Sequence, residues 1–359
     1  MKMEEWRRLA SRHCREAPIY WRPVRIVQYH ANDDIRLIDH PAPTAAAGEV
    51  VVALRACGIC ASDVLEWYMR PRAPLFPGHE VVGVVVDTGD GVEALSRGDR
   101  VWVHHHAPCG ICSLCRRGAS TNCPQFRATR LRPGGLAEYF AVPAPIVATS
   151  VHRLPDALLD AAATLIEPLA CCVRSLRRAG FHPGADVLVV GAGVTGLLHV
   201  RLARAWGAER IEVVEVEPSR HAAALRSGAD RAMTPGDADA LALSVPTVIV
   251  TPASTGAISW ALERVAPGGT LLQFGPTGPD ETLPFQPYRV FFREVTLTSS
   301  YSAGVDDGTT ALSIIARDPG FCDGLIDRVL PLEEAAEAFR LTATHRESLK
   351  MVLTAMAPA

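Results

Sequence analysis

The first third of the chain alternates short β-rich segments with turns. Strand-favouring residues gather in runs bounded by glycine, proline or charged residues, at positions 24–29, 35–38, 48–56, 80–87 and 97–103. The first two runs lie close together, which predicts a hairpin. The pattern therefore predicts a compact, mostly-β region over this part of the chain.

From about Ala157 the pattern becomes helical and then alternates between strands and helices. Asp186 is followed by four valine or leucine residues, typical of a strand buried on both faces, and 197–206 has the pattern of an amphipathic helix. The alternation continues through 210–215, 247–250, 259–265 and 269–274. It predicts an α/β region with a parallel, doubly wound sheet.

Length and composition narrow the class of protein. A chain of 359 residues favours two domains, and 48% hydrophobic with 21% charged residues is typical of a soluble globular protein. The formal net charge of -3 argues against a polyanionic partner. No apolar run reaches the roughly twenty residues of a membrane span. We therefore expect neither nucleic acid nor a membrane as a partner.

Residues 1–22 differ from the rest of the chain. They combine arginines with Glu4, Glu5 and Glu16 and lack the apolar core of a signal peptide. An organelle presequence would be poor in acidic residues. We predict an N-terminal extension, a short helix or arm outside the two domains, and a cytoplasmic location.

Four cysteines give the clearest chemical signal. Cys109, Cys112, Cys115 and Cys123 have the spacing C-x2-C-x2-C-x7-C, which makes a closed tetrahedral site for one structural zinc ion. A disulfide framework is more typical of short secreted chains. The spacing therefore predicts a structural zinc lobe.

A glycine-rich loop follows the buried strand at 187–190. Gly191, Gly193 and Gly196 form the pattern G-x-G-x-x-G between a strand and a helix, where backbone N–H groups favour a pyrophosphate. Glu215 lies 24 residues after Gly191, at the end of the next strand, where a carboxylate can bind ribose hydroxyls and repel a 2′-phosphate. The pattern favours NAD, while the nearby Arg220 keeps NADP as the alternative.

A second set of metal ligands is predicted upstream of the cysteine lobe. Cys60, His79 and a carboxylate would hold zinc with an open position, where an alcohol oxygen is polarised for hydride transfer to a nicotinamide. Ser62 could accept and pass on the alcohol proton, and Asp63 could orient His79. Each residue alone is weak evidence, but the cysteine lobe and the glycine loop in the same chain strengthen the interpretation.

The motifs together resemble a known family. They are Gly58-Ile-Cys60-x-Ser-Asp63, Gly78-His79-Glu80, the four-cysteine lobe, Gly134-Gly-Leu-Ala-Glu-Tyr139, Glu167-Pro-Leu and Gly191-x-Gly-x-x-Gly196. Their order and spacing resemble those of the zinc-dependent medium-chain alcohol dehydrogenases, in the sorbitol and polyol dehydrogenase branch. The resemblance implies a GroES-like catalytic domain at 23–170 and 306–359, a Rossmann NAD-binding domain at 171–305, and an active-site cleft between them.

The resemblance also assigns site residues. It implies that Cys60 and His79 are ligands of a catalytic zinc, which with the lobe makes two zinc ions per subunit. Glu80 and Glu167 compete as the carboxylate ligand; we prefer Glu167, on the segment that enters the Rossmann domain. The expected cofactor-binding residues are Gly191, Gly193, Val194, Thr195, Gly196, Glu215, Arg220, Gly275 and Ser300.

The chain departs from the family pattern at two positions. Ala61 stands where many relatives have glycine, and Leu65 stands where the family often has a relay histidine. Ser62 is therefore expected to pass its proton through the cofactor ribose to water. We interpret Cys171 and Cys172 as buried helix residues. The run 104–106 of three histidines is expected to end a strand before the cysteine lobe, outside the active site.

The resemblance suggests a secondary alcohol on a hydroxylated substrate, such as a sugar alcohol, sugar acid, cyclitol or amino alcohol, interconverted with its ketone. Trp67 and Tyr68 are candidate walls of the substrate pocket. A homo-oligomer, dimer or tetramer, is expected. The alternatives are a zinc-free NADPH-dependent quinone or enoyl reductase of the same superfamily, or a non-catalytic protein on the same scaffold.

Overall fold

Strands from both ends of the chain meet in one sheet of the computed structural model, which describes residues 23–344 and 349–355. The predicted extension at 1–22 lies outside the described residues. The sheet has the order β14-β15-β3-β4-β5-β7, with β6 paired to β3. Its strands are β14 (Ile326–Pro331), β15 (Lys350–Thr354), β3 (Val50–Gly58), β4 (Glu80–Thr88), β5 (Arg100–His104), β7 (Val151–Arg153) and β6 (Tyr139–Val142).

The predicted hairpin is present beside this sheet. Strands β1 (Val24–Ala31) and β2 (Asp34–His40) pair antiparallel. The connections contain short helices that strand propensity did not predict, so the region is less uniformly β than expected. These helices are α2 (Glu66–Met69), α3 (Ser113–Arg116), α4 (Pro124–Ala128), α5 (Ala144–Thr149) and α6 (Asp160–Ala163).

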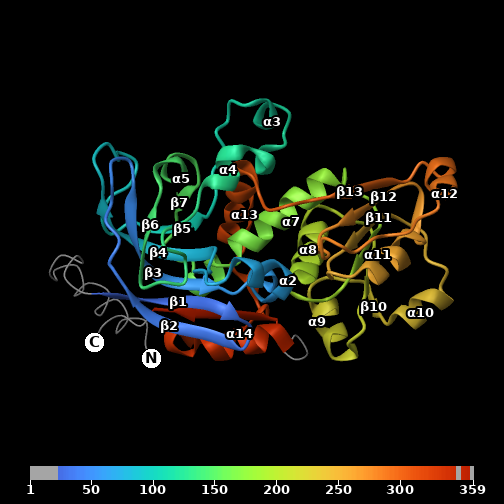
Figure 1. The fold of residues 1–359 in the computed structure, drawn as a ribbon. Helices are drawn as coiled ribbons and strands as arrows, with labels where there is room; N and C mark the ends of the chain where they lie inside the picture. The colour runs from blue at the N-terminus through green and yellow to red at the C-terminus, as the bar shows by residue number, and fades with distance from the viewer. Residues whose placement is uncertain (1–22, 345–348, 356–359) are drawn as a thin grey trace.

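The second sheet has six parallel strands in the order β10-β9-β8-β11-β12-β13, as the α/β pattern predicted. Figure 1 labels β10 to β13 of this sheet among the helices that surround it. They are β8 (Val187–Val190), β9 (Ile211–Val214), β10 (Arg231–Met233), β11 (Val245–Val250), β12 (Val265–Gln273) and β13 (Thr296–Ser299). The helices of this part are α7 (Ile166–Arg178), α8 (Val194–Ala205), α9 (His221–Arg226), α10 (Pro235–Ala240), α11 (Thr255–Leu262), α12 (Pro287–Phe292) and α13 (Val305–Arg317), and α14 (Ala335–Thr344) follows β14.

Strand β8 shows why this sheet is buried on both faces. Val187 and Val189 pack in a cluster with α7 and α8, while Leu188 and Val190 pack in a separate cluster with α11. Successive side chains of a strand point to opposite faces, so a strand between two helix layers must be apolar throughout. The continuous apolar run in the sequence follows from this.

The two sheets share core residues through α7 and α13. Val82 and Trp102 of the first sheet belong to the same hydrophobic cluster as α7, α8 and α13. The predicted domain boundary at 170/171 falls inside α7, and the boundary at 305/306 falls after the first residue of α13. Both boundaries stay predictions.

Among the described residues, no helix combines the length and the apolar composition that a membrane crossing requires.

Candidate active site and metal centres

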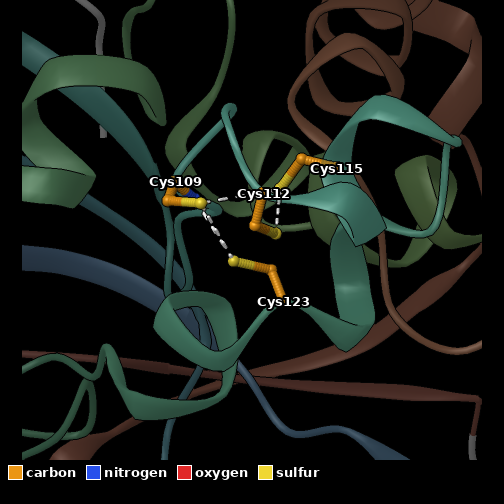
Figure 2. A group of neighbouring side chains, drawn as sticks. All are labelled: Cys109, Cys112, Cys115 and Cys123. Carbon is orange, nitrogen blue, oxygen red and sulfur yellow. Dashed lines mark hydrogen bonds between the residues drawn. The ribbon is translucent and has the colours of Figure 1, made fainter.

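The four cysteines of the lobe converge on one point (Figure 2). The Sγ–Sγ distances are 3.5 Å for Cys112–Cys115, 3.6 Å for Cys109–Cys123 and 4.0 Å for Cys109–Cys115. Zinc–sulfur bonds of about 2.3 Å in a tetrahedron place the sulfurs about 3.8 Å apart. All four cysteines are free thiols, so each can bind a metal. The observed Sγ–Sγ distances are close to the tetrahedral value, and the lobe therefore fits one zinc ion.

Local backbone geometry makes this convergence possible. Gly110 and Gly118 have φ angles of 74° and 79°, a region that side chains other than glycine rarely adopt, so the chain turns sharply on each side of α3. The Cys109 N–H also donates to the Cys123 sulfur over 3.4 Å. This hydrogen bond stabilises a thiolate, the form that binds metal.

A second donor set lies where β3 and β4 meet. Cys60, His79 and Glu80 each place one ligand atom within 4.8 Å of the other two. Cys60 follows β3 as the N-cap of a 3-10 helix, η3 (Ala61–Val64), and His79 and Glu80 stand at the start of β4. A thiol, an imidazole and a carboxylate form a donor set that suits an open zinc site.

Asp63 connects the cysteine to the histidine. Its Oδ2 accepts from the Cys60 backbone N–H at 3.1 Å, and its Oδ1 lies 3.5 Å from Nδ1 of His79. Burial works to lower the pKa of His79, but Asp63 and the Cys60 thiol raise it well above the ordinary value. A carboxylate on one ring nitrogen leaves the other directed to a metal, as in other carboxylate–histidine–zinc sites.

The Glu80 carboxylate has a lysine partner that competes with a metal ion for its oxygens. Lys350 Nζ, from β15, donates to both carboxylate oxygens at 2.6 Å and to the Ile59 carbonyl at 3.0 Å. Both side chains are almost fully buried. Burial lowers the pKa of Lys350, but Glu80 outweighs it and the net shift is upward, so the lysine is charged at neutral pH.

Glu167 groups with other residues. Its carboxylate lies within 4.8 Å of ring nitrogens of His104 and His105, and not within the Cys60–His79–Glu80 set. Burial raises the pKa of Glu167 to about 7, against the opposing effect of His79. The His105 ring lies 4.9 Å from the His79 ring, so the two sets are neighbours. Our preference for Glu167 as the zinc ligand stays a prediction.

Ser62 and Cys171 lie beside these donors. The Ser62 backbone N–H donates to the Cys60 sulfur at 3.5 Å, which places the serine next to the metal-binding thiol. The Cys171 thiol donates to Glu167 Oε1 at 3.5 Å, and burial raises its pKa well above the ordinary value. Cys172 is fully buried and contacts His199, as expected of a core residue.

The glycine loop has the conformation that a nucleotide site needs. Gly191 has a φ of 95°, and a Cβ on Gly196 would lie 2.0 Å from the Gly191 carbonyl oxygen. At Gly193, by contrast, the nearest atom to a Cβ would be Arg220 Nη1 at 3.9 Å. Gly193 is therefore the open position of the loop, and Val194 and Thr195 begin α8 directly after it.

Glu215 lies beside the same loop. Its Oε2 accepts from the Ala192 N–H at 2.6 Å, and its Oε1 accepts from the Glu217 N–H at 2.9 Å. The carboxylate thus ties the end of β9 to the loop. Each oxygen keeps a further lone pair for a ribose hydroxyl.

The remaining predicted residues lie at the ends of the Rossmann strands. Gly275 follows β12, and a Cβ there would meet the Thr251 carbonyl oxygen at 2.5 Å. Ser300 follows β13, and its buried hydroxyl has no hydrogen-bond partner within the described part of the chain. Trp67 and Tyr68 of α2 are partly exposed and their rings contact each other at 5.7 Å.

Lys350, His104 and His105 are site residues that sequence reasoning missed or set aside. A lysine directly before the apolar run Met351–Leu353 was the available signal for Lys350, since a charge in a buried strand needs a partner. The sequence predicts only that the histidine run 104–106 ends a strand. His104 does end β5, but His104 and His105 also face Glu167.

Family models match both parts of the chain. The model described as "Alcohol dehydrogenase GroES-like domain" matches residues 46–156, and the model described as "Zinc-binding dehydrogenase" matches residues 194–317. The first match contains Cys60, His79 and the cysteine lobe. The second contains Glu215 and most of the parallel sheet.

Relatives extend the match over most of the chain. A protein named probable D-xylulose reductase A, from Aspergillus clavatus, is 30% identical over 327 residues, which cover 85% of this chain and 90% of that protein. Sorbitol dehydrogenase from Bombyx mori is 34% identical over 212 residues, covering 57% of this chain and 60% of that protein.

Solved structures show the same fold. A protein assigned as a zinc-binding dehydrogenase from Sinorhizobium meliloti 1021, bound to NADP, is 25% identical with a TM-score of 0.83, covering 92% of this chain and 99% of that one. An alcohol dehydrogenase from Escherichia coli CFT073 with NADH is 25% identical with a TM-score of 0.82, covering 93% and 99%. Fold and site thus define a two-domain zinc-binding dehydrogenase. The chain belongs to the zinc-dependent medium-chain alcohol dehydrogenases, in their polyol dehydrogenase branch.

Proposed function

We propose that this protein is a zinc- and NAD-dependent dehydrogenase that interconverts a secondary alcohol of a polyol, or a related hydroxylated compound, and its ketone. The observation that carries the proposal is the donor set of Cys60, His79 and Glu80 in a chain that also has an open glycine loop. In the oxidation, the carbinol hydrogen leaves as hydride to the nicotinamide and the hydroxyl proton is released, which gives a ketone, NADH and H⁺.

The residues of the chain divide this chemistry between them. Cys60 and His79 bind the catalytic metal, with Glu80 or Glu167 as the third ligand. Zinc bound there would supply a Lewis acid that lowers the pKa of the alcohol oxygen. Asp63 orients the His79 ring, and Ser62 takes the alcohol proton and passes it toward solvent. The lobe cysteines hold a second, structural zinc.

On the cofactor side, the N–H groups at the start of α8 bind the pyrophosphate, and Gly193 lets it approach the backbone. Glu215 binds the adenosine ribose, while Gly275 and Ser300 line the nicotinamide half. NAD is preferred because the Glu215 carboxylate repels a 2′-phosphate. Arg220, close to Gly193, is the group that would favour NADP.

Glu215→Ala should weaken NAD binding by about 10- to 100-fold and narrow the preference over NADP, because a charge-assisted hydrogen bond to ribose and a repulsive charge are lost together. Kd and kcat/KM for both cofactors measure this. Glu217→Ala removes a carboxylate two residues away and is the matched control. A wild-type protein that uses NADP better than NAD would contradict the assignment.

The proposed reaction is tested with a panel of polyols, cyclitols, sugar acids and amino alcohols, following NAD reduction by absorbance. We expect turnover of at least one substrate with a secondary hydroxyl, and loss of turnover after the zinc is removed. Turnover of quinones or enoyl thioesters with NADPH instead, unaffected by chelation, would favour the zinc-free reductase. That alternative, like a non-catalytic scaffold, leaves the Cys60–His79–Glu80 set without a use.

The protein also has a surface suited to self-association. Tyr288, Phe291 and Phe292 on α12 are 66% to 75% exposed, and β13 is the edge strand of the parallel sheet beside them. An edge strand next to exposed aromatic residues is an open pairing surface. We propose a homo-oligomer built across this edge.

The proposed partners of the active site are small-molecule alcohols and ketones. The cytoplasmic location stays a prediction.

A further inference from the structure

The stretch 105–137, which contains the cysteine lobe, is strongly basic. It has no aspartate, glutamate or lysine, and its arginines are Arg116, Arg117, Arg127, Arg130 and Arg132. Arg132 pairs with Glu49, whereas the other arginines make no ion pair within the part of the chain that the structure describes. The whole chain has a formal net charge of -3, so this concentration of positive charge is local and attracts anions to the lobe.

Arg127, on α4, lies against a residue that follows the last strand of the parallel sheet. Its guanidinium carbon is 5.5 Å from the centre of the Tyr301 ring. Its Nη2 donates to Asn122 Oδ1 at 2.9 Å, which uses one of the five N–H groups of a guanidinium. Tyr301 is half exposed and comes directly after Ser300, which we assign to the nicotinamide half of the cofactor site. Arg127 is therefore next to the proposed place of hydride transfer.

Arg130 is connected to the catalytic donors through a carbonyl group and two imidazole rings. Its Nη1 donates to the Thr129 carbonyl oxygen at 3.3 Å, and the same oxygen lies 2.6 Å from Nδ1 of His106. The centre of the His106 ring is 4.1 Å from that of His105. The His105 ring is in turn 4.9 Å from the ring of His79, the proposed zinc ligand. Arg130 thus belongs to the surroundings of the metal site.

Tyr301 shows that the two arginines lie around the same space. Burial raises the pKa of Tyr301, and the neighbouring Tyr68 adds to this rise. The positive charges of Arg127 and Arg130 oppose it, and so does His79. One hydroxyl group is therefore within electrostatic range of both arginines, of the candidate pocket wall and of the metal-binding histidine.

The position of the lobe beside the active site is fixed by α7. Arg174 Nη2 donates to the Gly118 carbonyl oxygen at 3.3 Å and to Thr121 Oγ1 at 3.4 Å. Nη1 of the same arginine lies 3.5 Å from Asp307, which also pairs with Arg177. The acidic residue at this contact is thus already neutralised by the body of the protein, and it leaves the lobe arginines for a ligand.

We propose that Arg127 and Arg130 bind an anionic group of the substrate, a carboxylate or a phosphate, while the reacting hydroxyl lies at the catalytic metal. The inference rests on the proposed function and narrows its substrate class to sugar acids or sugar phosphates. A guanidinium matches the geometry of both anions. The anionic group takes no part in hydride transfer; it orients the substrate so that one particular secondary hydroxyl reaches the metal.

Matched substrates test the proposal: aldonates and alditol phosphates, each compared with the neutral alditol of the same carbon chain. For the zinc-loaded wild type, kcat/KM should be at least about tenfold higher for an anionic member than for its neutral partner. The double variant Arg127→Met/Arg130→Met should lose this ratio, and high salt should lower it in the wild type. Arg117→Met removes another exposed arginine of the lobe and is the matched control, which should keep the ratio.

Titration calorimetry with the same compounds needs no turnover and separates this inference from the proposed function. Anion binding that the double variant loses, without turnover of any compound, would reject the proposed reaction and keep the anion site. Turnover of neutral alditols with no advantage for an anion would keep the reaction and overturn the anion site. So would an equal loss of the ratio in Arg117→Met, or no binding of any anion. A preference for aldonates identifies a sugar acid, and a preference for the phosphates identifies a sugar phosphate.

Discussion

Cys60→Ala should lower kcat/KM for the alcohol by at least about a thousandfold and leave NAD binding nearly unchanged. Polarisation of the alcohol oxygen by zinc is worth several kcal/mol, and each 1.36 kcal/mol changes the rate tenfold. Without the thiolate, His79 and one carboxylate are too few ligands for a stable open site. The glycine loop and Glu215 lie in the other domain, so the cofactor still binds.

Steady-state kinetics, NAD titration by fluorescence and elemental analysis together measure this effect. Cys57→Ala is the matched control, because it removes a buried thiol three residues earlier that belongs to none of the donor sets. The variant Cys60→Ala should lose one zinc ion relative to wild type, while the control should lose none. Full activity in Cys60→Ala, or a full complement of zinc without activity, would contradict the role given to this residue.

Lys350→Met should lower the free energy of unfolding by about 3 to 5 kcal/mol, the usual cost of leaving one partner of a buried ion pair unpaired. Glu80 is fully buried and receives both of its 2.6 Å hydrogen bonds from this lysine. The Ile59 carbonyl oxygen would lose its donor as well. Guanidinium denaturation of the zinc-loaded protein, followed by circular dichroism, measures the change.

Two further variants distinguish the effect of breaking the buried ion pair from the effect of removing a basic side chain. The double variant Glu80→Gln/Lys350→Met removes both charges and should recover much of the lost stability, because no charge is then buried alone. Arg340→Met breaks an exposed pair with Glu337, which solvent screens, and should destabilise the protein much less than Lys350→Met. If Lys350→Met were no more destabilised than Arg340→Met, the pair would contribute little to the fold.

Several parts of the site could be predicted from the sequence because their chemistry is local. The lobe cysteines lie within fifteen positions, and the glycines of the loop lie within six, directly after an apolar strand. Spacing on this scale fixes which side chains can converge, whatever the rest of the chain does. The parallel sheet was predictable for a related reason, since a strand covered on both faces must be apolar along its whole length.

The partners of the two buried glutamates could not be predicted from local sequence, because they lie far away in the chain. Glu80 and Lys350 are 270 positions apart and meet because β15 pairs with β3 beside the start of β4. Glu167 meets His104 and His105 because α7 packs against the sheet that contains β5. From the sequence, Glu80 and Glu167 compete as the zinc ligand, with Glu167 preferred, and the histidine run is predicted to end a strand.

The sequence by itself therefore determined the donor types, the cofactor loop and the class of fold, because each is encoded in a short segment with a fixed geometry. Only the tertiary structure decided which partner each buried charge has. That choice depends on strand pairing and helix packing between distant segments. In a buried environment the partner in turn decides whether a carboxylate is neutralised by a lysine or left to bind a metal.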